Sequence, residues 1–238
     1  MTEPDLSILP PTEHRMEGEL RVCDPSTIDH TGTIDAMRIE RMQQELQEGF
    51  DLLRKYRLAA SIFGSSRALP DSQDYKDAEA LATKLSKSGF AIITGGAGGI
   101  MEAANKGAFE AGGQSVGLNI ALPTEQASNS YLTEQKTFNY FFTRKVMLTF
   151  ASEVYVYFPG GFGTLNEFFE ILTLIQTKKI KRVPIILYGS AYWTPLLEII
   201  QNHIYGTYNA IDKDDINIYT LVDGVDAAYD QILKSVKC

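Results

Sequence analysis

The stretch Pro-Gly-Gly-Phe-Gly-Thr-Leu-Asn-Glu, residues 159–167, decides the fold class and the kind of site in this chain. It lies between an apolar run, residues 154–158, and an amphipathic stretch, residues 168–175, which predicts a strand, a glycine-rich turn and a helix start in direct succession. Such a junction directs several backbone N–H groups and the positive end of a helix to one point, which suits a phosphate. Glu167 is expected in the first helical turn, so the sequence predicts an anion site with a carboxylate beside it.

The same alternation of apolar runs and amphipathic stretches extends over residues 57–238. Continuous apolar runs followed by helical patterns are typical of parallel strands covered on both faces. We therefore expect a single α/β domain, a Rossmann-like doubly wound parallel sheet with helices on both faces. The expected strands are residues 58–63, 90–94, 114–120, 154–158, 183–187 and 216–221, further helices are expected at residues 72–88, 100–111, 141–151, 191–202 and 225–236, and residues 123–137 are expected to form a polar loop.

The N-terminal part of the chain departs from this pattern. Residues 1–33 carry scattered prolines and charges without a sustained apolar period, which predicts a flexible tail. Residues 34–56 repeat apolar side chains at helical spacing among Glu, Gln and Arg, which predicts an amphipathic helix. Its apolar face is expected either to cover an edge of the core or to contact a second subunit.

Composition excludes several classes of protein. The 238 residues carry a formal net charge of −8, so no general field attracts nucleic acid or an anionic membrane. No apolar stretch is long enough to span a bilayer, and the N-terminus lacks the apolar region of a signal peptide. Cys23 and Cys238 form no metal-binding spacing and the histidines are scattered, so we expect no metal site. These features favour a cytoplasmic protein.

Two further turns follow expected strands. Residues 64–67 (Gly-Ser-Ser-Arg) and residues 95–99 (Gly-Gly-Ala-Gly-Gly) come where parallel strands end at a common edge, so Ser65 and Gly96 are candidate ligand contacts. The glycine loop does not match a dinucleotide fingerprint, because Met101 stands where the third glycine would be. Glycines that only permit a tight turn and close helix–strand packing remain the alternative for this loop.

Glu167 and the basic pair Arg144-Lys145 each have two interpretations. Thr164 to Glu167 fits a capping box, in which the two side chains satisfy backbone N–H groups at the helix start, and it equally fits a carboxylate that serves the anion site. Paired basic residues are usually solvated, but these two lie in an apolar segment, and a partly buried guanidinium needs an anionic partner. That partner is either a phosphate or Glu167.

Three motifs together resemble the Lonely Guy (LOG) family. They are Thr-Gly-Gly-Ala-Gly-Gly-Ile-Met-Glu-Ala-Ala at residues 94–104, Thr-Arg-Lys at residues 143–145, and the PGGxGTxxE motif at residues 159–167, within a resemblance that runs from about residue 58 to residue 205. Family members are cytokinin-activating phosphoribohydrolases and related nucleotide hydrolases, long labelled as lysine decarboxylases. The resemblance implies hydrolysis of the N-glycosidic bond of a nucleoside 5′-monophosphate, such as a cytokinin riboside 5′-monophosphate or AMP. It implies a homodimer or higher homo-oligomer, and no cofactor.

The resemblance also assigns residues. The arginine of the Arg-Lys pair and the last glutamate of PGGxGTxxE are catalytic in the family and correspond to Arg144 and Glu167. Glu167 is expected to stabilise the ribose cation and to orient or deprotonate water, while Arg144 fixes the phosphate or positions Glu167. Asn166 replaces a glutamate that plant members often carry, so the preferred base stays open. The expected substrate-binding residues are Ser65, Gly96, Glu125, Lys145, Gly160, Gly161, Gly163 and Thr164.

The alternative from another class is a nucleotide or cofactor carrier that uses the same cradle without turnover. Retention of both Arg144 and Glu167 favours the enzyme, because a pure binder has less need of a carboxylate beside an anion. A pyridoxal phosphate decarboxylase is excluded on chemistry, since apart from the phosphate loop itself no lysine of the sequence has the setting of a Schiff-base lysine.

Overall fold

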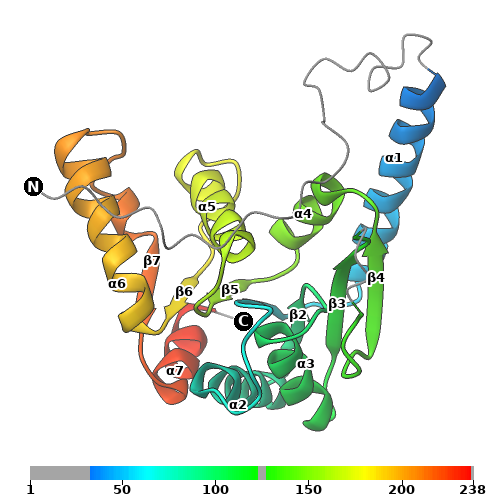
Figure 1. The fold of residues 1–238 in the computed structure, drawn as a ribbon, viewed down its shortest axis with the longest axis horizontal. Helices are drawn as coiled ribbons and strands as arrows, with labels where there is room; N and C mark the ends of the chain where they lie inside the picture. The colour runs from blue at the N-terminus through cyan, green and yellow to red at the C-terminus, as the bar shows by residue number, and fades with distance from the viewer. Residues whose placement is uncertain (1–32, 123–126, 237–238) are drawn as a thin grey trace, which may run out of the picture. The chain divides into compact units, whose positions relative to one another are not determined.

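The computed structural model describes residues 33–122 and 127–236 (Figure 1). The expected tail lies outside these residues apart from Thr33, as do Cys23, Glu125 and Cys238. The chain divides into two compact units, Met1–Arg41 and Met42–Cys238, and the described part of the first unit is the beginning of helix α1 (Thr33–Leu53). The sequence predicts this helix at residues 34–56, and it ends at Leu53.

Strands and helices alternate through the second unit. The strands are β1 (Ala59–Phe63), β2 (Ala91–Thr94), β3 (Ser115–Ile120), β4 (Glu134–Phe138), β5 (Val154–Tyr157), β6 (Ile185–Tyr188) and β7 (Tyr219–Val222). The helices that follow α1 are α2 (Gln73–Lys87), α3 (Ile100–Glu110), α4 (Phe141–Thr149), α5 (Phe162–Gln176), α6 (Ser190–Ile199) and α7 (Val225–Ser235), together with a π-helical segment η3 (Ile200–Thr207) and a short 3₁₀ helix η4 (Asp215–Asn217).

The described residues form one seven-stranded sheet in the order β4-β3-β2-β1-β5-β6-β7, and all neighbouring strands are parallel. The chain adds β2, β3 and β4 on one side of β1, and then β5, β6 and β7 on the other. The expected doubly wound parallel sheet is confirmed. Strand order reverses between β1 and β5, and in such sheets the crevice beyond the carboxyl ends at the reversal is where ligands bind.

The central strands contribute side chains to two cores, because successive residues of a strand point to opposite faces. In β1, Ala59 and Phe63 join the core that contains residues of α4, α5 and α6, whereas Ala60 and Ile62 join the core that contains residues of α2, α3 and α7. These two groups of helices lie on opposite sides of the sheet (Figure 1). Every residue of β1 is buried for this reason, which explains the continuous apolar run in the sequence.

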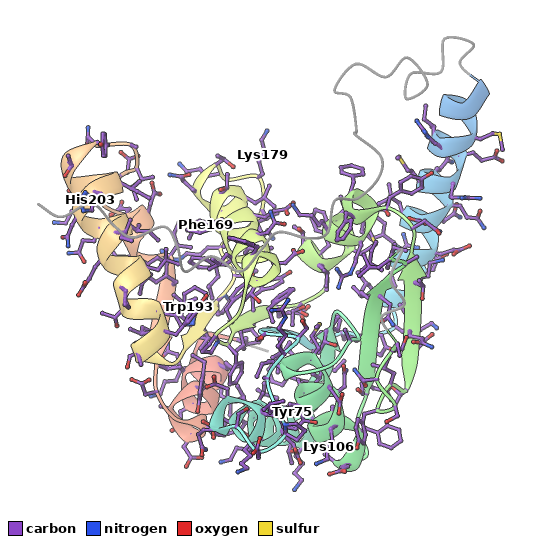
Figure 2. The ribbon with its side chains drawn as sticks, in the orientation of Figure 1. Tyr75, Lys106, Phe169, Lys179, Trp193 and His203 are labelled. Atoms are coloured by element: carbon purple, nitrogen blue, oxygen red, sulfur yellow. The ribbon has the colours of Figure 1, made fainter. Side chains whose placement is uncertain are left out.

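Polar contacts fix helices in both layers, to a neighbouring helix in one layer and to a strand in the other. Lys106 of α3 pairs with Glu79 of α2, with an N–O distance of 3.0 Å, and Figure 2 labels it near Tyr75 in this layer. In the opposite layer, Trp193 of α6 is fully buried and donates from Nε1 to the carbonyl oxygen of Tyr157 at 3.1 Å. Helix α6 is thereby fixed to the end of β5, next to the turn that carries the PGGxGTxxE motif.

Strand β4 corrects the prediction of a loop over residues 123–137. Its residues, Glu134 to Phe138, pair in parallel with β3 at the edge of the sheet. An edge strand is open on one side, and in β4 Phe138 alone is buried while the other residues are half-buried or exposed. Because charged and polar side chains fill those other positions, the strand lacks the apolar pattern by which the remaining strands were predicted.

The helical region that begins with α6 is longer than the sequence predicted. The helix expected at residues 191–202 is α6, and it continues directly into the π-helical segment η3 rather than ending. Among the residues that the structure describes, no helix combines the length and the apolar character needed to cross a membrane.

Candidate functional site

A cavity of about 1010 Å³ opens at the carboxyl ends of β1, β2, β3 and β5. Its walls are the turn after β1, the glycine loop after β2, the end of β3, helix α4, and the turn and first residues of α5. This is the reversal point of the sheet. The structure brings together here all the predicted site residues except Glu125, which lies outside the described residues: Ser65, Gly96, Arg144, Lys145, Gly160, Gly161, Gly163, Thr164 and Glu167.

The helix start in the PGGxGTxxE motif corrects the capping-box interpretation. Helix α5 begins at Phe162 with Gly161 as its N-cap residue, no side chain caps it, and its first turn holds no acidic residue. Thr164 is therefore the third helical residue instead of the cap, and Glu167 lies in the second turn. The prediction of Glu167 in the first turn is wrong for the same reason: the helix begins within the glycine-rich segment. The carboxylate of Glu167 is thus free of a capping role.

The N-terminus of α5 presents its unpaired N–H groups to the cavity. A side chain added at Gly161 or Gly163 would meet no atom within 4 Å, so the backbone there faces open space that a ligand can fill. The turn before it is fixed, since the Tyr192 hydroxyl donates to the carbonyl oxygen of Gly160 at 2.6 Å and a Cβ at Gly160 would collide with Thr164. Unpaired N–H groups and the helix dipole make this end of α5 suited to a phosphate.

Arg144 enters the cavity from α4 and is held by backbone carbonyl groups. Its Nε donates to the oxygen of Leu118 at 2.7 Å, at the end of β3, and its Nη2 lies 3.5 Å from the oxygen of Gly95, just after β2. A Cβ at Gly95 would collide with Nη2, so the absence of a side chain there leaves room for the guanidinium. Burial lowers the pKa of Arg144, and the charge of Glu167 opposes that effect. The guanidinium is fixed in place with donors left for an anion.

Glu167 is the buried carboxylate of the cavity, with 9% of its surface exposed. Burial raises its pKa from the usual 4.5 to about 7, against the lowering effect of Arg144, while Glu170 adds to the rise and Lys145 opposes it. Among the described residues, none makes a hydrogen bond to its carboxylate oxygens. A carboxylate that titrates near neutrality and has free lone pairs suits a general base or a cation stabiliser.

Lys145 lines the cavity beside Arg144, but its ammonium group forms an ion pair with Glu170 of α5. Both side chains are about a quarter exposed, at 27% and 28%. The structure therefore places Lys145 at the wall and gives it a partner of its own, so its role toward a ligand stays a prediction.

A buried polar network that sequence reasoning missed supports the glycine loop. The Asn105 side chain, fully buried in α3, accepts from the Thr94 hydroxyl at 2.6 Å and from Asn129 Nδ2 at 2.9 Å, and donates to Ser115 Oγ at 2.9 Å. Thr94 in turn accepts from the N–H of Gly96 at 2.9 Å, where the backbone has a φ of +74°. The loop is thus held in a conformation that favours glycine.

Replacing Asn105 with alanine is expected to lower the free energy of unfolding by about 3 kcal/mol, because the buried Thr94 and Ser115 and the half-buried Asn129 each lose a hydrogen bond. Urea denaturation measures this change. As the matched control, alanine at the exposed Asn202 is expected to change stability by less than about 0.5 kcal/mol. Equal stability of the two variants would show that the network contributes nothing.

Two more cavity residues escaped sequence reasoning. Asn119 lies at the end of β3 with 7% of its surface exposed, and its buried Oδ1 has no hydrogen-bond partner among the described residues. A polar residue in an otherwise apolar strand was the available signal. Arg67 follows β1 and lines the cavity with an exposed side chain, which adds positive charge at the rim.

Within the described part of the chain, no cluster of His, Cys, Asp and Glu has the arrangement of a metal site.

The fold and the cavity define the class of protein: a Rossmann-like α/β protein whose cavity at the switch point of the sheet contains a buried arginine and a buried carboxylate. The model of the family described as "Possible lysine decarboxylase" matches residues 101–232, more than half of the chain. The chain belongs to this family, which is the LOG family that the three motifs indicated.

Two of the curated relatives carry the name of the same activity. A cytokinin riboside 5′-monophosphate phosphoribohydrolase of Rhodococcoides fascians is 29% identical over 130 residues, which cover 52% of this chain and 65% of the relative. A probable enzyme of the same name from Oryza sativa subsp. japonica is 28% identical over 133 residues, covering 56% of this chain and 57% of the relative. The chain thus spans less than two thirds of the length of these two relatives.

Solved structures share the fold. The X-ray structure of a protein named TM1055 covers 75% of this chain and 99% of its own, with 29% sequence identity and a TM-score of 0.55. The molybdenum cofactor binding protein of the phototrophic bacterium Rippkaea orientalis covers 74% of this chain and 94% of its own, with a TM-score of 0.56. At 21% sequence identity, the latter shows a likeness of fold alone.

Proposed function

We propose that this protein hydrolyses the N-glycosidic bond of a nucleoside 5′-monophosphate, releasing the free base and ribose 5-phosphate. The observation that carries the proposal is the position of Glu167 and Arg144 within one cavity, next to the unpaired N-terminus of α5. The names of the curated relatives support the same reaction. A cytokinin nucleotide and a plain purine monophosphate such as AMP both satisfy this chemistry.

The substrate phosphate would bind at the start of α5. Backbone N–H groups of residues 162–164 are available there, and the positive end of the helix favours a doubly charged group. Arg144 lies in the same cavity and supplies the neighbouring positive charge. Because Glu167 lies one turn further along α5, a phosphate at the helix end places the attached ribose next to the carboxylate.

Cleavage then needs stabilisation of a sugar cation. As the bond between ribose C1′ and the base nitrogen breaks, its electron pair leaves with the base and positive charge develops on the ribose. Ionised Glu167 opposes that charge and accepts a proton from the attacking water, whose oxygen forms the new bond to C1′. The base takes up a proton. The hydroxyl group of the water thus ends on ribose 5-phosphate, and a hydrogen ends on the free base.

The competing proposal is a nucleotide or cofactor carrier that binds in the same cavity without turnover. The two proposals differ over Glu167. A carrier gains nothing from an unpaired, buried carboxylate close to a bound phosphate, since like charges repel. The raised pKa of Glu167 means that the ionised carboxylate is destabilised in the folded protein. A catalytic role accounts for such a group, whereas binding alone does not.

The test is a panel of nucleoside 5′-monophosphates, including AMP and a cytokinin riboside 5′-monophosphate, with free base measured by chromatography. Release of base and of ribose 5-phosphate in equal amounts supports the hydrolase. Tight binding of a monophosphate, measured by calorimetry, without any release of base would support the carrier instead. The preferred base emerges from the same panel.

We also propose that the protein works as a homodimer or a higher oligomer. Two large aromatic side chains that line the cavity are exposed, Phe141 at 57% and Phe162 at 92%, and Phe142, next to Phe141 in the chain, is 62% exposed. Exposed apolar groups gathered beside a site are typical of a contact surface. Sedimentation of the full chain measures the oligomeric state, and a monomer at micromolar concentration would contradict this proposal.

A further inference from the structure

A buried glutamate of α1 lies outside the cavity yet contacts the helix that carries Arg144. Glu45 has 3% of its surface exposed. One oxygen of its carboxylate accepts from the backbone N–H and from the side-chain Nδ2 of Asn139, both at 2.8 Å. The other accepts from the Thr143 hydroxyl at 2.5 Å. All three donors therefore belong to the segment that leads into α4 and forms its first turn.

The contact lies at the N-terminus of α4, which lacks a capping side chain. The N-cap residue of α4 is Tyr140, and no side chain of the helix's own sequence makes the capping hydrogen bond. A carboxylate at the positive end of a helix is favourable, and Glu45 supplies that charge from another element. Thr143 directly precedes Arg144, whose own N–H donates to the Tyr140 oxygen at 3.2 Å. Glu45 thus binds the residue that directly precedes Arg144.

Packing along the same helix reinforces this contact. Gly49 approaches α4 so closely that a Cβ there would lie 2.4 Å from Met147 Sδ. One residue on, the ring of Phe50 lies 6.1 Å from the ring of Phe150, at the end of α4. Residues 45–50 therefore contact the α4 segment at three points: its first turn, Met147, and Phe150 just after its end.

The charge of Glu45 is stabilised in place. Burial acts to raise its pKa, yet hydrogen bonds from Thr143 and Asn139 hold the pKa below the usual value. The groups that face the carboxylate are thus hydrogen-bond donors of the α4 segment. If this buried carboxylate moved away from its donors, it would lose the hydrogen bonds that stabilise its charge, which costs free energy. It therefore holds the groups that it binds in place.

We propose that Glu45 is a positioning residue of the active site: it fixes the first turn of α4 so that Arg144 keeps its guanidinium against the carbonyl groups of Leu118 and Gly95. Residues 42–53 of α1, which precede the region matched by the family model, then help to position a residue of the site. For its effect on turnover, this inference rests on the proposed hydrolase activity.

The test compares Glu45→Leu and Glu45→Gln with Glu48→Gln in the full-length protein. Leucine removes every acceptor, and displacement of Arg144 by about an ångström is expected to lower kcat/KM about 100-fold. Glutamine keeps an acceptor for Asn139 and can donate to the Thr143 hydroxyl, so it is expected to restore activity to within about threefold of wild type. Glu48 pairs with Lys136 at the surface one turn away, and its variant is expected to stay within about twofold.

A double-mutant cycle with Arg144→Lys separates positioning from general stability. If Glu45 acts through Arg144, Glu45→Leu should lower kcat/KM by less than about twofold once Arg144 is already replaced. Equal losses in both backgrounds would overturn the inference. Melting temperatures of all variants are measured alongside, and kinetics are recorded below the lowest of them, so that a loss of folding is not read as a loss of positioning.

A crystal structure of Glu45→Leu gives a readout that does not depend on turnover. The separation of 2.7 Å between Arg144 Nε and the Leu118 oxygen should be lost. If the wild type fails to release base from any monophosphate, the proposed function fails while this measurement still decides the inference. An unchanged Arg144 in the variant would overturn the inference even if the enzyme activity is real. Should Glu45→Leu fail to crystallise, the structure of Glu45→Ala answers the same question.

Discussion

Replacing Glu167 with glutamine is expected to lower the release of free base about 1000-fold and, at pH 8, to make the folded protein more stable. The activity is lost because glutamine can neither carry the negative charge that opposes the ribose cation nor accept a proton from water. Glutamine has nearly the same shape, so the cavity and nucleotide binding are expected to survive. Chromatographic detection of base and calorimetry with AMP measure the two properties separately.

The gain in stability follows from the raised pKa of Glu167. Its pKa is about 7 in the folded protein and 4.5 without the folded environment, so between these values the folded state holds a proton that the unfolded state has released. Stability due to this group is therefore present at low pH and is lost as the pH rises toward 7. The full difference corresponds to roughly 3 kcal/mol, which glutamine recovers above pH 7.

Thermal unfolding at two pH values checks this sign. At pH 8 the melting temperature of Glu167→Gln is expected to rise by about 8 °C, and most of the rise is expected to disappear at pH 5. Glu79→Gln, on the opposite layer of the sheet, removes a half-buried carboxylate that pairs with Lys106 and should give no gain. A Glu167→Gln protein that is equally active, or less stable at pH 8, would contradict the role given to this carboxylate.

Replacing Arg144 with methionine is expected to lower kcat/KM about 100- to 1000-fold and to move the acid limb of its pH profile upward. In the wild type the limb should lie near pH 7, where Glu167 ionises, with activity falling as the pH drops below it. Arg144 lowers the pKa of Glu167 by its charge. Without that charge the carboxyl group keeps its proton to a higher pH, so the variant needs more alkaline conditions to reach its own maximum.

Lys145→Met is the matched control for this prediction. Lys145 is the neighbouring cation, lowers the pKa of Glu167 less than Arg144 does, and already pairs with Glu170. Its replacement should shift the acid limb in the same direction by a smaller amount. Equal shifts for the two variants, or no shift for Arg144→Met, would show that Arg144 and Glu167 do not interact as the structure places them.

Much of the sheet could be predicted because its strands are buried on both faces. Strand β1 and strand β5 read as apolar runs in the sequence for that reason, and each ends in a glycine- or serine-rich turn. Strand β4 could not be predicted in this way. It is an edge strand whose charged residues pair with α1 and with the residues just after it: Lys136 contacts Glu48 of α1, and Glu134 contacts Lys55 and Tyr56.

In the candidate site, too, some residues could be predicted from the sequence and others could not. Arg144 and Glu167 could be proposed from motifs, but the sequence left open whether Glu167 caps its helix, because a capping box and a catalytic motif share the same letters. The start of α5 at Phe162 decides against the cap. Asn119 and the Asn105 network remained unpredicted, since a buried polar side chain is understood only through its partners, and these come from distant parts of the chain.

The sequence by itself determined the alternating α/β pattern, the glycine-rich turn and helix start at residues 159–167 and the membership of the LOG family. These are local properties, set by periodicity, by glycine and by the order of short motifs. Only the tertiary structure decided that Glu167 is buried with a pKa of about 7 beside Arg144, and that Glu45 holds the helix from which Arg144 projects. Burial, charge interaction and capping between separate elements depend on which segments meet in space, and no single stretch of sequence carries that information.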